Sequence, residues 1–241
     1  MDFSRDTIEK ILELAAVETI DVAGRKYTSK PLHKVLDPEL APVSVNTLTG
    51  FVDYILSEKD DYPINDVMIQ VVDHSTVKLI STIQGDFKQR STYAVAGASW
   101  YQNPFEFGRN YDTESFNVAL QSLFDETGDR AKILEVVGNL RAEDVKTVKD
   151  DGVTQQVTAK VGVVRSEEVD VPNPVVLKPF RTFREIEQPA SKFVFRLKSG
   201  QNGSLPTCAL FSADGQSWKL EAIGSIEQFL KDRISHITII A

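Results

Sequence analysis

Residues 46–83 read NTLTGFVDYILSEKDDYPINDVMIQVVDHSTVKLISTI, and this stretch has the clearest secondary-structure pattern of the chain. Apolar residues in its first third recur with the spacing of one helix face, which predicts an amphipathic helix over 46–57. An acidic loop, 58–63, follows. Two β-branched runs, Val67–Val72 and Val77–Ile83, then predict a pair of strands joined by a polar turn. A helix followed by neighbouring strands is typical of an α+β fold rather than of alternating βαβ units.

The residues that precede this stretch predict a helix and a hairpin. Ser4 or Asp6 can cap a helix over 4–17, because apolar residues follow at the spacing of one helix face. These apolar residues are Ile8, Ile11, Leu12 and Ala15. The next run, 19–27, predicts a hairpin that turns at Ala23-Gly24.

The residues that follow it predict more strands and a helical hairpin. A third strand spans 90–99, and Asp112 caps a helix whose apolar stripe includes Phe116 and Leu120. A second helix begins after the break at 127–129, so the two helices form a hairpin. The remaining expected elements are strands between 145 and 176 with a turn at 150–152, a strand at 191–198, a glycine-rich loop at 200–203, strands at 205–212 and 217–221, a helix at about 225–233 and a last strand at 237–240.

Taken together, these elements predict an α+β fold with antiparallel sheets, amphipathic helices and a helical hairpin. The chain has 241 residues, of which 41% are hydrophobic and 26% charged. That composition is ordinary for a globular protein that builds its own core. The pattern favours an N-terminal α+β part at 1–105 and a C-terminal α+β part at 106–241, with one compact domain as the alternative.

The charge of the chain changes sign along its length. Residues 1–66 hold 7 basic and 13 acidic side chains, residues 67–170 hold 11 and 16, and residues 171–241 hold 9 and 6. The net charge of −8 argues against a general coat for duplex DNA, because neutralising phosphates requires clustered cations. The basic C-terminal segment still permits a local groove for an anionic partner.

The N-terminal residues lack the basic and apolar segments of a secretory signal. No apolar run reaches the ~20 residues that a membrane span needs. The sequence therefore predicts a cytoplasmic protein that does not enter membranes.

Neither the cysteine nor the histidines form a recognisable reactive or metal-binding motif. The single cysteine, Cys208, excludes an intramolecular disulfide and is expected to be a buried, inert thiol. His33, His74 and His236 lie far apart, without a companion at metal-ligand spacing. The glycine-rich loop opens a strand, so it lacks the helix N-terminus of a phosphate site. The sequence predicts no catalytic residue, no cofactor, no metal site, and a protein that is not an enzyme.

A basic and aromatic tract in the C-terminal part holds the residues best suited to contact a partner. Residues 178–184 read KPFRTFR, and residues 192–198 read KFVFRLK. In the second run, strand alternation sends Phe193, Phe195 and Leu197 to one face and the cations to the other.

Two interpretations of this tract remain open. The favoured one is a strand with its aromatic residues in the core and its cations in water. The alternative is a face for single-stranded nucleic acid, on which Phe180 or Phe183 would stack on bases. The candidate residues for contact with nucleic acid or a partner protein are Lys178, Arg181, Arg184, Lys192, Arg196 and Lys198.

The order of elements in the latter half of the chain resembles that of an uncharacterised family of tailed-phage and prophage proteins that includes YfdQ. The resemblance rests on Phe183-Arg184-Glu185-Ile186 running into 193–197, with a strand pair and a terminal helix beyond. A helix pair at 113–140 ahead of a long strand hairpin also fits this order. The resemblance implies a phage accessory protein, of the kind often encoded near DNA-recombination genes. It carries over no catalytic residue.

These observations lead to two functional hypotheses. The first is a non-enzymatic phage or prophage accessory protein in the cytoplasm of an infected or lysogenic bacterial host. It would act as a homo-oligomeric assembly or as an interaction module with a host or phage protein, and would counter host defence. The second is an accessory of phage DNA metabolism that binds single-stranded nucleic acid. The apolar strand at 237–240 is expected to lie at a sheet edge or to pair with a neighbouring subunit.

Overall fold

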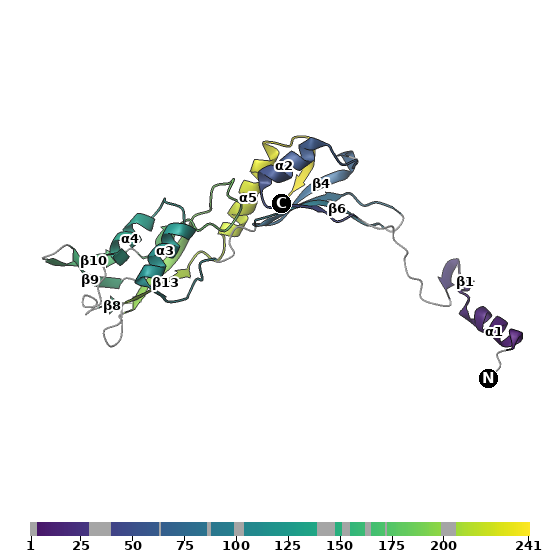
Figure 1. Cartoon of the computed structure of the whole chain (residues 1–241), viewed down its shortest axis with the longest axis horizontal. Coiled ribbons are helices and arrows are strands. Elements are labelled where there is room, and N and C mark those ends of the chain that lie inside the picture. The colour runs from purple at the N-terminus through teal and green to yellow at the C-terminus, as the bar shows by residue number, and fades with distance from the viewer. Residues whose placement is uncertain are drawn as a thin grey trace. The chain divides into compact units, whose positions relative to one another are not determined.

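The structure, a computed structural model, divides into two compact units, Met1–Leu40 and Ala41–Ala241. Figure 1 labels helices and strands of both units where there is room. The residues that the structure describes are 4–28, 40–62, 64–85, 88–98, 104–138, 148–150, 155–161, 165–171, 173–198 and 206–241.

The described residues of the first unit form a helix and a hairpin, as the sequence predicts. Helix α1, Arg5–Ala15, begins after Ser4, whose hydroxyl accepts a hydrogen bond from a backbone N–H of the first turn. Strands β1, Thr19–Val22, and β2, Arg25–Thr28, pair antiparallel. The two residues between them have φ values of 53° and 76°. Two positive φ values in a row are characteristic of the tight turns that match the twist of a hairpin.

The second unit contains a five-stranded mixed sheet in the order β14-β4-β5-β6-β3. Its strands are β3 at Val43–Val45, β4 at Val67–Asp73, β5 at Thr76–Ser81, β6 at Thr92–Gly97 and β14 at Thr238–Ile240. The three central strands run antiparallel, as predicted, whereas β3 and β14 run parallel to their neighbours. Parallel neighbours need long crossover connections, and both of these connections contain a helix.

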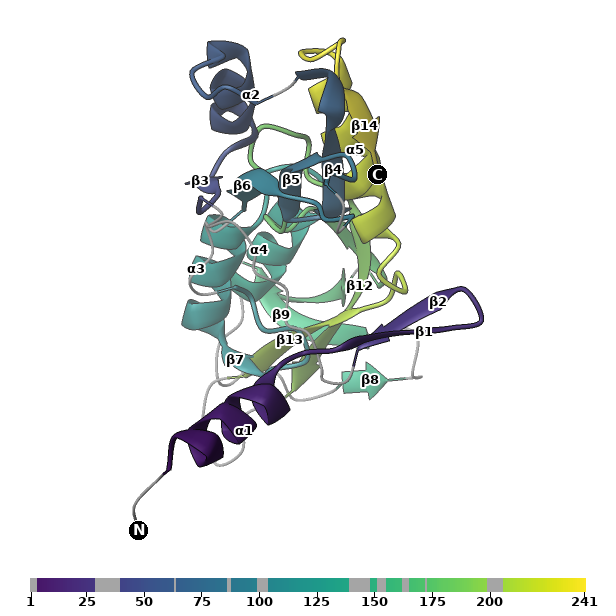
Figure 2. The same ribbon diagram turned by 90° about the vertical axis from the view of Figure 1, so that its right-hand side faces the viewer.

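Two helices cover one face of this sheet and close the first core. Helix α2, Leu48–Ser57, begins at Thr47, whose hydroxyl accepts from the Gly50 N–H. Helix α5, Trp218–Lys231, returns from the far end of the chain (Figures 1 and 2). A short 3-10 turn, Ile64–Asp66, leads from α2 towards β4. Apolar side chains of α2 and α5 are buried in one cluster with those of the sheet.

A second core lies between a four-stranded antiparallel sheet and a helical hairpin. The sheet has the order β11-β12-β13-β7. Its strands are β7 at Tyr111–Asp112, β11 at Val175–Leu177, β12 at Ser191–Lys198 and β13 at Thr207–Ser212. Helix α3, Thr113–Leu123, is capped by the carboxylate of Asp112, and α4, Arg130–Gly138, follows it. The predicted cap and helical hairpin are both confirmed.

A further antiparallel sheet contains β8 at Val148–Asp150, β9 at Gln155–Val161 and β10 at Arg165–Val171. It corresponds to the strands expected between 145 and 176. The turn expected at 150–152 and the glycine-rich loop at 200–203 extend outside the described residues.

The two cores of the second unit are interleaved along the chain. The first core takes most of its residues from 48–98 and 226–237, and the second takes its residues from 105–210. Near the boundary predicted at 105, the chain therefore stops contributing residues to the first core and begins to contribute them to the second. Helix α5 and strand β14 then add residues to the first core again. The division into parts 1–105 and 106–241 stays a prediction.

The predicted α+β class is confirmed, but one predicted element is wrong. A strand is expected at 217–221, but Ser217 is the N-cap of α5 and the next four residues form the first turn of this helix. The alternation seen in those five residues is too short to identify a strand. A longer helical spacing overrides it, because Trp218, Ala222 and Ile226 are all buried on one side of α5.

Candidate functional site

The cations of β12 lie on the outer face of the four-stranded sheet. Phe193, Phe195 and Leu197 are at most 2% exposed and pack in the second core. Because side chains alternate along a strand, the residues between them point away from this core. These outward residues are Lys192, Val194, Arg196 and Lys198. The favoured interpretation of this run, an amphipathic strand, is confirmed.

An aromatic side chain on the neighbouring strand shares this outer face. Phe211 in β13 stands directly opposite Val194 in the antiparallel register, and directly opposed residues point to the same side of a sheet. Its side chain is 42% exposed. Lys192 and Arg196 are the diagonal neighbours of Phe211 on β12. We define the outer-face patch as Val176, Lys192, Val194, Arg196, Lys198 and Phe211.

Sequence reasoning did not single out Phe211. The signal was present, because Cys208 and Leu210 in the same strand are apolar and buried, which sends Phe211 to the opposite side. Phe183, one of the two rings that the nucleic-acid alternative would place on bases, is completely buried, so it is not accessible for stacking. Phe180 is half-buried, and the Arg184 guanidinium lies 3.6 Å from its ring centroid.

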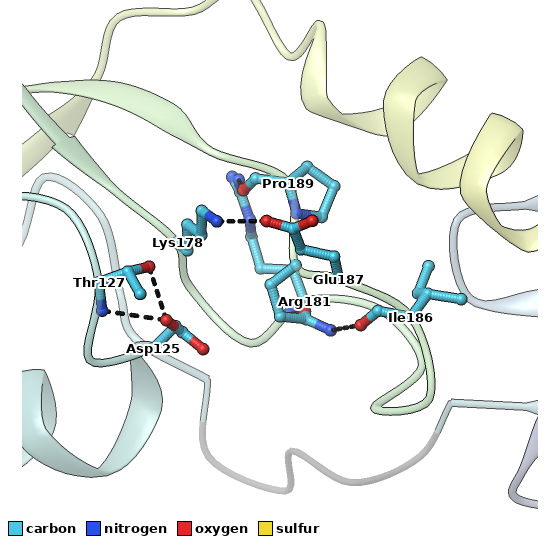
Figure 3. A network of polar contacts seen from close by, with 8 residues as sticks. Asp125, Thr127, Lys178, Arg181, Ile186, Glu187 and Pro189 are labelled. Carbon is cyan, nitrogen blue, oxygen red and sulfur yellow. Dashed lines mark hydrogen bonds and ion pairs between the residues drawn. The ribbon is translucent and has the colours of Figure 1, made fainter.

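The other basic residues of the tract lie on the loop that follows β11. Lys178 donates to the Glu187 carboxylate in an ion pair at 2.5 Å, which Figure 3 shows beside the Asp125–Thr127 hydrogen bonds. The hydrogen bond to Glu187 raises the pKa of Lys178 above its usual value. The charge of Lys178 is therefore partly neutralised within the protein.

Arg181 serves the internal structure of the second unit. Its guanidinium lies 3.8 Å from the centroid of the Trp218 ring and donates to the Ser191 hydroxyl at 2.6 Å. Burial lowers the pKa of Arg181 to about 10, so the side chain stays charged at neutral pH. The next residue, Thr182, donates to the backbone carbonyl of His74 in the turn between β4 and β5. These contacts join the second core to the first.

The structure thus separates the six candidate residues into two groups. Lys192, Arg196 and Lys198 share the outer face of β12. Arg181 contacts Ser191 and lies 5.9 Å from the ring centroid of Phe193, which are both buried residues on the inner side of that strand. The cations that share one face are therefore those of β12, and the described contacts of Lys178 and Arg181 are internal to the second unit.

A small pocket of about 350 Å³ is lined by the acidic loop Glu58–Tyr62. The Tyr54 hydroxyl donates to Asp60 at 2.6 Å, and burial, together with this carboxylate, raises the pKa of Tyr54. The Tyr62 and Tyr93 rings stack with centroids 5.3 Å apart. The Tyr54 hydroxyl therefore stays protonated at neutral pH.

Cys208 is buried in β13, and burial raises the pKa of its thiol to about 12, which matches the inert thiol expected from the sequence. Among the described residues, no three histidine, cysteine or acidic side chains are grouped as metal ligands. His33 lies outside the described residues. Within the described part of the chain, no helix combines the length and the apolar character that crossing a bilayer requires.

Helix α1 forms a second candidate surface. None of its residues is buried, although the predicted apolar stripe is present. Ile8 is 48% exposed, Ile11 51% and Leu12 64%. The hairpin of the same unit also exposes apolar side chains, since Ile20 stands opposite Tyr27 and both are about half-exposed. The sequence identified the stripe, but it did not reveal that the stripe is exposed.

Comparisons with protein-family models, with curated proteins and with solved structures return no match to this chain.

Proposed function

We propose that the protein is a non-enzymatic interaction module that self-associates through its N-terminal unit. The observation that carries this proposal is the exposure of α1, an eleven-residue helix with an apolar stripe and no buried residue. An isolated helix of this length is marginal in water, and most helices are stabilised by packing of their apolar face. The stripe therefore requires a partner surface.

The charge of α1 favours a protein partner over a lipid surface. Its charged residues are Arg5, Asp6, Glu9, Lys10 and Glu13, which leave it with a net negative charge. Helices that lie on membranes are usually rich in lysine and arginine on their polar face. The proposed partner is a second copy of this chain, because closed homo-oligomers are the commonest assemblies of soluble proteins.

The second unit has a feature that supports the same proposal. Strand β14 is the outermost strand of the five-stranded sheet, and Ile240 in it is 42% exposed. The sequence-based expectation that this strand lies at an edge is confirmed. An edge strand presents backbone donors and acceptors to a neighbouring chain. Pairing of β14 with another subunit stays a prediction.

Light scattering on the full chain tests the proposal. The expected native mass at micromolar concentration is at least twice the 26.9 kDa of the chain. Leu12→Glu in the stripe should reduce the mass towards the monomer, because it places a charge in the apolar contact. Leu14→Glu is the matched control, since Leu14 is 67% exposed but lies off the stripe.

A monomer at all concentrations would contradict self-association. Equal losses of mass in Leu12→Glu and Leu14→Glu would contradict the role of the stripe while leaving self-association intact.

The biological setting of the proposal rests on the resemblance to tailed-phage and prophage proteins. In that setting the assembly would act in the cytoplasm of the bacterial host and would counter a host defence protein. Mass spectrometry of proteins that co-purify from an infected host, compared between wild type and Leu12→Glu, tests this part. A host or phage protein retained by both variants would bind elsewhere than on α1.

A further inference from the structure

We infer that α1 of one copy packs on the β1–β2 hairpin of a second copy, and that the two copies exchange this contact reciprocally. The inference rests on the proposed self-association and names the surface that receives the apolar stripe of α1. Three observations carry it. The hairpin has an apolar face, the helix and hairpin of one chain follow each other end to end, and their net charges are opposite.

The antiparallel register gives the hairpin one apolar face and one polar face. Directly paired residues point to the same side of a sheet, and side chains alternate along each strand. Ile20 and its partner Tyr27 therefore share a face with Val22, and all three are exposed. Asp21 and its partner Lys26 lie on the opposite face. An isolated two-stranded hairpin is marginally stable in water, so its apolar face requires a covering element as α1 does.

In the described part of the first unit, α1 does not cover this face of its own hairpin. Only residues 16–18 separate α1 from β1, and Ala16 is extended, with φ −62° and ψ 144°. The chain therefore continues from the helix into the hairpin without reversing its direction. Figures 1 and 2 show the two elements end to end rather than side by side. This connection leaves both the stripe and the hairpin face to another chain.

A two-fold axis near Val17 makes the contact reciprocal. Helix α1 is about 16 Å long at the usual rise of a helix, and each strand of the hairpin is about 13 Å long at the usual rise of a strand. Two copies that lie antiparallel thus place each helix on a hairpin of similar length. Such a dimer is closed and contains two identical contacts. It places Ile8 near Val22 and Leu12 near Ile20 of the second copy.

The charges of the two elements favour this arrangement over packing of α1 on α1. Helix α1 holds three acidic and two basic residues, whereas residues 19–28 hold one acidic and two basic residues. The helix therefore has a net charge of −1 and the hairpin a net charge of +1. Helix on hairpin brings opposite charges together, whereas helix on helix brings like charges together. Charge and length both support the hairpin of the second copy as the partner surface.

Disulfide cross-linking between chains that carry different cysteines tests the contact. The single native cysteine, Cys208, is buried, so a cysteine introduced in the first unit supplies the accessible thiol. A mixture of Ile8→Cys and Val22→Cys chains should form a covalent dimer under mild oxidation, because the arrangement places these residues on facing elements of different chains. Intact-mass spectrometry distinguishes this mixed dimer from dimers of either variant alone.

The variant Leu12→Cys on its own is the control for packing of α1 on α1. Across an axis near Val17, the two copies of this residue lie at least about 15 Å apart at the usual rise of a helix. A disulfide requires Cα atoms within about 7 Å, so Leu12→Cys should cross-link poorly with itself.

A pair of neighbouring substitutions tests the apolar face of the hairpin by light scattering. Ile20→Glu should reduce the native mass towards the monomer, as is expected of Leu12→Glu. Thr19→Glu is the matched control, because it adds the same charge one residue away on the opposite face. It should retain the wild-type mass, and circular dichroism should show that the second unit is folded in every variant.

The possible results separate this inference from the proposed function. A native mass that falls in Leu12→Glu but not in Ile20→Glu would overturn the inference and leave self-association through α1 intact. Efficient cross-linking of Leu12→Cys with itself, without the mixed dimer, would do the same and would place α1 on α1. Equal losses of mass in Ile20→Glu and Thr19→Glu, without the mixed dimer, would exclude the apolar face of the hairpin. A monomeric wild type would contradict both proposals.

Discussion

Helices α1 and α2 are nearly equal in length, at 11 and 10 residues, and both have an apolar stripe, yet only α2 is buried. In α2, Leu48, Phe51 and Ile55 are at most 1% exposed. In α1 the described residues of the first unit leave the corresponding stripe uncovered. The comparison shows that sequence periodicity identifies a helix and its apolar face, but not the surface against which that face packs. Helix α2 finds its partner in the same unit, whereas we assign the partner of α1 to another copy of the chain.

The largest expected difference between the two helices concerns truncation of the stripe. Phe51→Ala should lower the free energy of unfolding of the second unit by about 3–5 kcal/mol, because it removes a fully buried ring and leaves a cavity. Leu12→Ala in dilute protein should change the free energy of unfolding by less than about 0.5 kcal/mol, as is usual for a substitution at an exposed position. Urea denaturation followed by circular dichroism measures both. A large effect of Leu12→Ala in the monomer would mean that α1 packs within its own chain.

A second comparison uses two glycines in the left-handed region of the backbone. Gly24 in the hairpin of the first unit has φ +76°, and nothing within 4 Å would meet an added Cβ. Gly128, between α3 and α4, has φ +73°, and an added Cβ would lie 2.5 Å from the backbone oxygen of Val176. Gly24→Ala should cost about 1 kcal/mol for conformation alone. Gly128→Ala adds a clash with the backbone, so its cost should be clearly larger, at about 2–3 kcal/mol.

Thermal denaturation of the second unit measures the effect of Gly128→Ala, whereas Gly24→Ala should leave that transition unchanged. A wild-type melting temperature in Gly128→Ala would show that the contact between Gly128 and β11 does not form in solution.

The helix caps offer a smaller and closely matched comparison. Thr47 caps α2 by accepting from the Gly50 N–H at 2.9 Å, and Ser4 caps α1 by accepting from the Thr7 N–H at 3.3 Å. Thr47→Ala should destabilise the second unit by about 1 kcal/mol. Ser4→Ala should leave that unfolding transition unchanged and lower only the helical content of the first unit. A shift of the main transition by Ser4→Ala would contradict the independence of the two units.

The smallest expected effect is the contribution of His74 to the pH dependence of the stability of the second unit. Burial lowers the pKa of His74 below its ordinary 6.5, so the folded state favours the neutral imidazole. The unfolded chain takes up the proton more readily, and stability must therefore fall as the pH drops below about 6.5. His74→Gln should remove this slope between pH 7 and pH 5. An unchanged slope in His74→Gln would assign it to other groups.

The sequence identifies most elements of the second unit because their patterns agree with their tertiary setting. Asp112 was recognised as a cap, and the alternation in 191–198 correctly placed its aromatic residues in the core. The start of α5 was missed because a five-residue alternation competes with a helical spacing that becomes visible only over fourteen residues. The parallel pairing of β3 and β14 was missed because strand pairing depends on crossovers between distant segments.

The candidate site was only partly predictable for a related reason. The direction of Lys192, Arg196 and Lys198 follows from the local alternation of one strand. Arg181 lies three residues after Lys178 in the sequence, but its environment is set by Trp218, which comes from another part of the chain. Phe211 enters the patch through the register between β12 and β13, and no local pattern specifies this register.

The most direct test of the central claim compares α1 and α2 by hydrogen–deuterium exchange in one sample at several protein concentrations. If the partner of α1 is a second copy, the protection of its backbone amides should rise with concentration, whereas that of α2 should stay constant and high. Leu12→Glu should abolish the rise, and Leu14→Glu should preserve it. Protection of α1 that is equally high at every concentration would place its partner within the same chain, and α1 amides that exchange freely at all concentrations would contradict self-association through this helix.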